Sequence, residues 1–301
     1  MRTICIGQSD LEVGAIAYGC WRFASSTVDE ATAKIRAALN LGMTLIDTAD
    51  IYGFGEPAGF GGAERILGDV LRADPSLRKR MVLATKGGIT IPTPYNSSYD
   101  YLMDAMDASL ERLGVEHVDL YMIHRPDLTA PVEETARALN HMVSSGKTRY
   151  LGVSNHTVPQ MRALEAHLEV SLISTQPEFS ALHQDPITDG TLDWCAERRA
   201  TALAWSPLGG GSLATGVAGQ GADKAMVERV MGVVDRLAET HGATRTQIAL
   251  AFTMAHGVNV VPIIGTQTIS RMEEAAGAAH VSLGKRDFYD LVEAYRGEGM
   301  P

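Results

Sequence analysis

Four ionisable side chains near the ends of predicted strands have the types needed for proton transfer. Asp47 and Tyr52 lie in the segment DTADIYG, Lys86 ends MVLATK, and His124 ends VDLYMIH. If Asp47 keeps Lys86 charged, the ammonium favours a phenolate and lowers the pKa of Tyr52 from about 10 toward neutral pH. Such a tyrosine can donate a proton to a carbonyl oxygen, with His124 as a second hydrogen-bonding group. The alternative is a structural ion pair beside a loop tyrosine, and spacing alone favours neither interpretation.

These residues follow short apolar runs that alternate with segments of helical periodicity. The apolar runs predict eight strands, at Ala15–Tyr18, Thr44–Asp47, Met81–Lys86, Val118–His124, Tyr150–Ser154, Leu172–Gln176, Thr201–Trp205 and Asn259–Ile263. Helical spacing predicts helices at Asp29–Leu41, Glu64–Ala73, Tyr101–Leu113, Val132–Ser145, Val158–His167, Thr191–Arg198, Asp223–His241, Thr246–His256, Ser270–Ala279 and Arg286–Tyr295. This alternation predicts parallel strands joined by right-handed crossovers. Eight such units favour an α/β fold of the (β/α)8 TIM-barrel type, with a doubly wound open sheet as the alternative.

Two predicted helices lie outside the repeating strand–helix unit. One is an extra helix before the eighth strand, and the other is Arg286–Tyr295 at the C-terminus. No linker or shift in composition divides the chain, so residues 1–301 are expected to form a single domain, although length alone suggests two. The segment Pro207–Gly221 is rich in glycine and is expected to be a mobile loop.

The composition limits the class of protein. With 45% apolar and 21% charged residues, the chain can bury a core, which excludes disorder. A net charge of −10 argues against a protein that binds nucleic acid or a membrane surface. Cys5, Cys20 and Cys195 are too few and too far apart for a disulfide framework or a zinc site. With no signal peptide and no apolar run of about 18 residues, the sequence indicates a soluble, cytoplasmic protein.

Polar and aromatic residues also end the later strands. In a barrel, the carboxyl ends of all strands open onto one face, where active sites lie. Besides Asp47, Lys86 and His124, this position is occupied after the fifth, sixth and seventh strands by Ser154, Asn155, Gln176, Trp205 and Ser206. One histidine after a strand is more often structural than functional. Six strand ends that carry such groups together predict a shared site.

Five motifs, DTADIYG, ATKGG, YMIHRPD, GVSN and AWSPLGGG, together resemble the aldo-keto reductases over essentially the whole chain. In the motifs HRPD, LGGG and PIIG, the chain resembles short bacterial members of this family that are described only as predicted oxidoreductases. The resemblance implies a (β/α)8 barrel that binds NADP(H) across its C-terminal face and reduces a carbonyl without a metal. It further implies that Tyr52 is the general acid/base, that Lys86 and Asp47 tune it, and that His124 orients the carbonyl.

The resemblance also assigns residues to the cofactor. Ser154, Asn155 and Gln176 match residues that hydrogen-bond the carboxamide of nicotinamide. Trp205 matches an aromatic residue that stacks on the nicotinamide ring, a position where tyrosine is common. Glycines permit close approach of the backbone to the pyrophosphate, and the residues implied there are Ser206, Leu208 and Gly210.

The adenosine end of the implied cofactor site departs from the family pattern. In GTQTISRMEEA, Arg271 matches the arginine that binds the 2′-phosphate, and Glu274 matches the acid that contacts adenine. Gln267 stands where many members carry lysine, and Ala275 where many carry asparagine. These two changes would weaken a preference for NADPH over NADH.

The expected substrate is a small aldehyde or ketone, held by a monomer. Trp21, Phe54 and Arg125 are expected at the substrate end, with a place in the core as the alternative for Trp21. The segment Ile91–Tyr99, within the polar loop Thr90–Asp100, and the C-terminal residues are also expected to contribute to specificity, and a flexible glycine-rich loop, Gly53–Gly62, is expected nearby. An alternative function is that of an NADP(H)-binding regulatory subunit with little turnover. A metal-free lyase or isomerase of the same fold would bind no nicotinamide.

The Tyr52→Phe variant tests the role of Tyr52 in carbonyl reduction. It is expected to keep cofactor binding, measured by quenching of tryptophan fluorescence, because phenylalanine retains the aromatic ring at position 52. Carbonyl reduction should fall by about two to four orders of magnitude, because the proton donor is gone. Near-normal turnover in this variant would refute the role of Tyr52.

Overall fold

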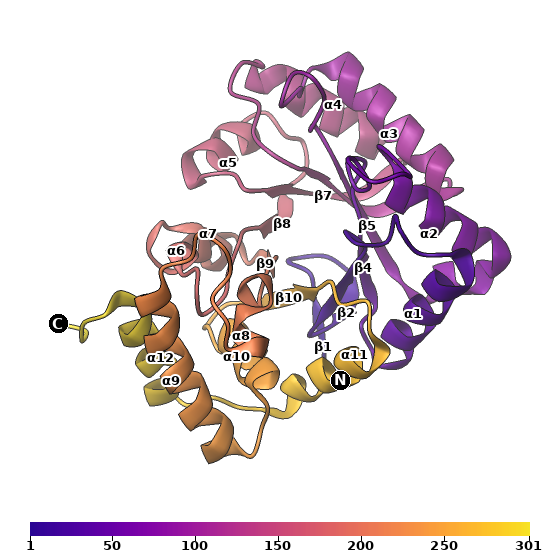
Figure 1. Cartoon of the computed structure of the whole chain (residues 1–301). Helices are drawn as coiled ribbons and strands as arrows, with labels where there is room; N and C mark the ends of the chain where they lie inside the picture. Colours follow the sequence, from indigo (N-terminus) through magenta and orange to yellow (C-terminus); the bar gives the residue numbers. More distant parts are fainter.

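The computed structural model describes residues 1–301 and contains a closed barrel of eight parallel strands, shown in Figure 1. In spatial order the strands are β10 (Val260–Ile264), β3 (Ala17–Gly19), β4 (Leu45–Asp47), β5 (Val82–Gly87), β6 (Val118–Ile123), β7 (Thr148–Ser154), β8 (Leu172–Gln176) and β9 (Thr201–Ala204). Each predicted strand coincides with one of these to within a few residues. The (β/α)8 barrel is confirmed, and the open sheet is wrong because β10 pairs with both β9 and β3.

Helices surround the barrel (Figure 1). They are α1 (Val28–Asn40), α2 (Gly62–Ala73), α3 (Tyr99–Leu113), α4 (Val132–Ser144), α5 (Val158–Glu165), α7 (Thr191–Arg198), α9 (Lys224–His241), α10 (Arg245–Met254), α11 (Ile269–Ala276) and α12 (Lys285–Arg296). All ten predicted helices are present. Three begin at capping boxes on Thr27, Thr157 and Thr244, which fix their first turns. The extra helices α9 and α12 pack side by side on the flank of the barrel.

Several short elements were not predicted from the sequence. An antiparallel hairpin of β1 (Thr3–Cys5) and β2 (Glu12–Gly14) precedes the barrel. The other short elements are η1 (Pro75–Arg80), α6 (Asp185–Thr188), η2 (Gly209–Gly211), α8 (Ser212–Thr215) and η3 (Gly277–His280). The segment Pro207–Gly221, expected to be a mobile loop, contains η2 and α8. Elements of three to six residues are too short for apolar periodicity to reveal them.

The hairpin closes one end of the barrel. Ile6 and Leu11, in the turn between its strands, belong to the apolar cluster that includes the barrel residues Leu45, Leu120 and Leu203. A second, larger cluster packs the outside of the sheet against the helices. Because the amino end of the barrel is filled in this way, a cavity can open only at the carboxyl ends of the strands.

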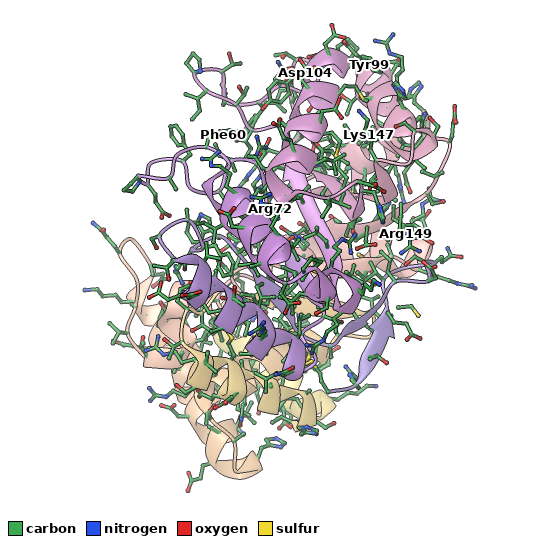
Figure 2. The ribbon with its side chains drawn as sticks, turned by 90° about the vertical axis from the view of Figure 1, so that its right-hand side faces the viewer. Phe60, Arg72, Tyr99, Asp104, Lys147 and Arg149 are labelled. Carbon is green, nitrogen blue, oxygen red and sulfur yellow. The ribbon has the colours of Figure 1, made fainter.

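The helices on the first half of the barrel pack closely around a buried polar group. Glu64 of α2 is fully buried, accepts a hydrogen bond from Thr85 Oγ1 at 2.5 Å and pairs with Arg112 Nε of α3 at 2.7 Å. Figure 2 shows this side of the molecule, with Phe60 and Arg149 at opposite ends of the barrel. The two helices are in close contact at Gly68, where a Cβ would lie 2.0 Å from the carbonyl oxygen of Arg112.

A pair of glycine substitutions tests this close contact. Gly68→Ala is expected to destabilise the fold by about 1–3 kcal/mol, because α2 and α3 must move apart. Gly232→Ala, in the open middle of α9 where a Cβ meets nothing within 4 Å, should instead stabilise it by about 0.5–1 kcal/mol. Urea unfolding measures both. Equal effects of the two substitutions would show that the close packing of α2 on α3 carries no energetic weight.

Candidate active site

The centre of the site is a buried ion pair at the carboxyl ends of adjacent strands. Lys86 of β5 is fully buried, and its Nζ donates hydrogen bonds to Asp47 Oδ2 at 2.7 Å and to the carbonyl oxygen of Thr48 at 2.8 Å. The second carboxylate oxygen, Asp47 Oδ1, accepts from Gln176 Nε2 at 3.0 Å. These bonds tie β4 and β5 to β8 across the barrel.

Tyr52 and His124 lie beside this pair. Their ring centroids are 5.7 Å apart with the planes at 79°, and Lys86 Nζ is 5.0 Å from the centroid of the Tyr52 ring. The loop Gly53–Gly62 is closed at its base by a hydrogen bond from the Ala63 amide to the Tyr52 carbonyl oxygen, at 3.1 Å, which anchors the tyrosine. The structure therefore brings together all four residues at which the sequence predicted proton chemistry.

The protonation states differ in one respect from the sequence-based expectation. Burial raises the pKa of Tyr52, and Lys86 only partly opposes this because the charge of Asp47 acts in the other direction. The expectation of a lowered tyrosine pKa is therefore wrong for the protein without ligands. Burial alone would lower the pKa of Lys86, but Asp47 and Tyr52 outweigh it and the pKa is raised. Burial, with Lys86 and Arg125, holds the pKa of His124 well below its usual range. The phenol is protonated, the lysine charged and the imidazole neutral.

A second group of hydrogen bonds orders the next wall of the site. Asn155 has a left-handed backbone (φ 57°), and its Nδ2 donates to Ser154 Oγ at 2.8 Å. Its Oδ1 accepts from the indole Nε1 of Trp205 at 3.0 Å, which fixes the plane of that ring. Ser154 Oγ in turn donates to the carbonyl oxygen of Gln176 at 2.9 Å. These residues from β7, β8 and the end of β9 form one network.

A cavity of about 840 Å³ joins these groups. The predicted site residues that line it are Trp21, Asp47, Tyr52, Phe54, His124, Arg125, Ser154, Asn155, Gln176, Trp205, Ser206, Leu208, Gly210, Gln267, Arg271 and Glu274. Lys86 alone does not, because it lies behind Asp47. A volume of this size exceeds what a small carbonyl compound needs, and it suits a dinucleotide with part of a substrate.

The end of the cavity near Tyr52 is aromatic and charged. Trp21 and Phe54 are 60% and 56% exposed, so the alternative place for Trp21 in the core is wrong. Two further residues there, Arg22 and Glu56, were missed by sequence reasoning. The Arg22 guanidinium carbon lies 5.4 Å from the Trp21 ring centroid. The sequence did contain a signal for Arg22, because this charged residue directly follows Trp21, an aromatic residue near the end of a strand.

One other expectation about this face is wrong, and one contact was missed. No residue of Thr90–Asp100 lines the cavity, where only the preceding Ile89 reaches it. At the far end, Gln267 accepts a hydrogen bond from Lys34 Nζ at 3.0 Å, a contact with α1 that sequence reasoning missed because the two residues are far apart in the chain.

Comparison with known proteins places the chain in a family. Residues 15–296 match the family model described as "Aldo/keto reductase family". The chain belongs to the aldo-keto reductase family, and it is therefore an oxidoreductase of the carbonyl-reducing type.

Two curated relatives carry the same name, "6-dehydroglucose reductase". The protein from Novosphingobium aromaticivorans is 47% identical, over 98% of this chain and 96% of its own length. The protein from Agrobacterium fabrum is 37% identical, over 95% of this chain and 96% of its own. The solved structure of the thermostable aldo-keto reductase Tm1743 with the inhibitor epalrestat superposes with a TM-score of 0.83 at 26% identity, over 98% of this chain and 100% of that chain.

The structure holds no group of three or more His, Cys, Asp or Glu side chains placed to bind a metal ion. None of its helices combines the length and apolar character needed to cross a bilayer.

His156 directly follows the hydrogen-bond network of Ser154 and Asn155 and is half-buried. Its Nδ1 lies 2.9 Å from the carbonyl oxygen of Ser154, and in the neutral form it donates to that oxygen. Burial lowers the pKa of His156 to about 4, with this hydrogen bond opposing. The folded protein therefore resists protonation of this ring.

This burial predicts a pH dependence of stability. Below pH of about 6.5 the unfolded chain takes up a proton at His156 before the folded protein does, so the free energy of unfolding falls until the folded ring titrates near pH 4. One such histidine contributes a slope of at most about 1.4 kcal/mol per pH unit. In urea unfolding, His156→Gln should reduce the decline over this range, whereas the exposed control His280→Gln should not. Identical pH dependence in wild type and His156→Gln would contradict the prediction.

Proposed function

We propose that this protein reduces a small aldehyde or ketone to the alcohol, with NADPH as the hydride donor and Tyr52 as the proton donor. The observation that carries the proposal is the meeting of a protonated tyrosine, a neutral histidine and a buried Lys–Asp pair at one wall of a single cavity. The other walls present the groups that a nicotinamide needs.

The residues of these walls fit a dinucleotide. The Gln176 amide nitrogen is bound to Asp47, so its Oε1 is left to accept from the carboxamide of a nicotinamide. The Trp205 ring, held at its edge by Asn155, can offer a face for stacking. Gly210 has φ 67° and open space where a Cβ would be, which allows a pyrophosphate to approach the backbone. When bound, the nicotinamide supplies the hydride that reaches the carbonyl carbon.

The protein's own groups handle the oxygen and the proton. Neutral His124 donates a ring N–H to the carbonyl oxygen and holds it near the Tyr52 hydroxyl. As negative charge develops on that oxygen, the phenol proton of Tyr52 passes to it and completes the alcohol. The phenolate left behind is stabilised by the Lys86 ammonium, which Asp47 keeps charged. A tyrosine that is fully protonated before the reaction suits this direction.

The substrate end of the cavity favours a hydroxylated substrate, and we propose a sugar aldehyde. Trp21 and Phe54 offer apolar faces on which the C–H face of a sugar can pack. A hydroxyl group both donates and accepts hydrogen bonds, and this end supplies donors in Arg22 and Arg125 and an acceptor in Glu56. The names of the two curated relatives support 6-dehydroglucose, a hexose with an aldehyde at C6, as the first compound to test.

Consumption of NADPH with 6-dehydroglucose and with propanal tests the reaction and its substrate class. We expect turnover of both, with the higher kcat/KM for the sugar aldehyde. Tight NADPH binding without turnover of any carbonyl compound would instead favour a regulatory subunit. Binding of neither NADPH nor NADH would refute both functions.

A lysine substitution tests the proton chemistry. Lys86→Met is expected to lower kcat by at least about a hundredfold, because the Tyr52 phenolate loses its stabilising charge. The Kd for NADPH should stay within a few-fold, because Lys86 does not line the cavity. Lys147→Met, which removes a surface lysine paired with Asp107, is the control and should leave kcat unchanged. A Lys86→Met protein that folds and retains wild-type kcat would contradict the mechanism.

A further inference from the structure

Lys34 of α1 forms no ion pair, and the nearest acidic side chain on its helix, Glu30, attracts it only at longer range. Its Nζ donates to Ser26 Oγ at 2.8 Å and to Gln267 Oε1 at 3.0 Å, and both acceptors are neutral. No carboxylate oxygen lies within 4.0 Å of it. Glu30, one turn earlier, is engaged in capping the helix through a hydrogen bond from the Thr27 amide at 2.9 Å.

This arrangement leaves the ammonium incompletely satisfied. Lys34 is partly buried, and a partly buried charge without a counter-ion is unfavourable. An ammonium has three hydrogens to donate, and Lys34 uses two of them. One donor and a full positive charge are therefore available for an anion.

The position of Lys34 connects it to the cavity. Its partner Gln267 lines the cavity together with Thr268 and Arg271. The guanidinium of Arg271 forms no ion pair, and α11, which begins at Ile269, directs the positive end of its dipole to the same place. Because α1 packs against α11, Lys34 reaches Gln267 from one helix while Arg271 of the other lines the same cavity, and neither cation forms an ion pair.

We propose that Lys34 and Arg271 together bind the 2′-phosphate of NADP(H), with Lys34 supplying from α1 the ammonium that many family members place at position 267. This proposal rests on the proposed function. Gln267 then acts as a positioning residue, since it lines the cavity and its Oε1 accepts a hydrogen bond from Lys34 Nζ. Lys34 thereby sets the preference for NADPH over NADH, because NADH lacks the phosphate and gains nothing from this charge.

Binding measurements with Lys34→Met test the proposal without requiring turnover. The probes are NADPH, NADH and adenosine 2′,5′-bisphosphate, titrated calorimetrically. We expect the Kd for NADPH and for the bisphosphate to rise by about 10- to 100-fold, the range for one lost charge-assisted hydrogen bond. The Kd for NADH and the thermal midpoint should not change, which a merely structural role of Lys34 would not produce. Lys34→Arg should retain most of the NADPH affinity.

Two further variants make the outcomes distinct. Lys224→Met, which removes an exposed lysine at the start of α9, should leave all three Kd values unchanged. If Arg271→Met weakens NADPH binding and Lys34→Met does not, the role of Lys34 is refuted and the proposed function stands. If wild-type protein binds neither NADPH nor the bisphosphate, both are refuted.

Discussion

A buried ion pair between Lys86 and Asp47 is the interaction on which the rest of the site depends. An ammonium without a partner at this depth would cost several kcal/mol, so the fold must bring a carboxylate to it. That requirement fixes the register of β4 against β5, and it draws Gln176 from β8 to the second carboxylate oxygen. Burial raises the pKa of Tyr52, and the charge of Asp47 offsets part of the opposing effect of Lys86. Tyr52 therefore remains protonated beside a lysine, contrary to what the residue types alone suggest.

Different loops at the carboxyl face of the barrel line the two ends of the cavity. Loops after β3, β4 and β6 supply the aromatic and charged residues at one end of the cavity, and the segments after β7, β8, β9 and β10 line the other. The hairpin β1–β2 fills the opposite end of the barrel and leaves this face as the place where a cavity can form. Asp47, Tyr52 and His124 line the cavity between these two ends.

Charge is distributed unevenly over this protein. Its net charge of −10 would repel a dinucleotide phosphate, but Arg271 and the start of α11 lie at the far end of the cavity, where Gln267 accepts a hydrogen bond from Lys34. In the sequence, Gln267 was notable only because it replaces a lysine. In the folded chain, Gln267 accepts a hydrogen bond from Lys34, a lysine of another helix.

The sequence by itself determined the order of strands and helices and which polar residues follow which strand, and it favoured a barrel over an open sheet, which the pairing of β10 with β9 and β3 then settled. Periods of 2 and 3.6 residues and capping residues such as Thr27 and Thr244 are local signals, and they survive in any context. Only the tertiary structure decided the protonation of Tyr52, the exposure of Trp21, the exclusion of Thr90–Asp100 from the cavity and the contact between Lys34 and Gln267. Each of these depends on burial or on side chains from distant elements, and neither is encoded in the spacing of residues along the chain.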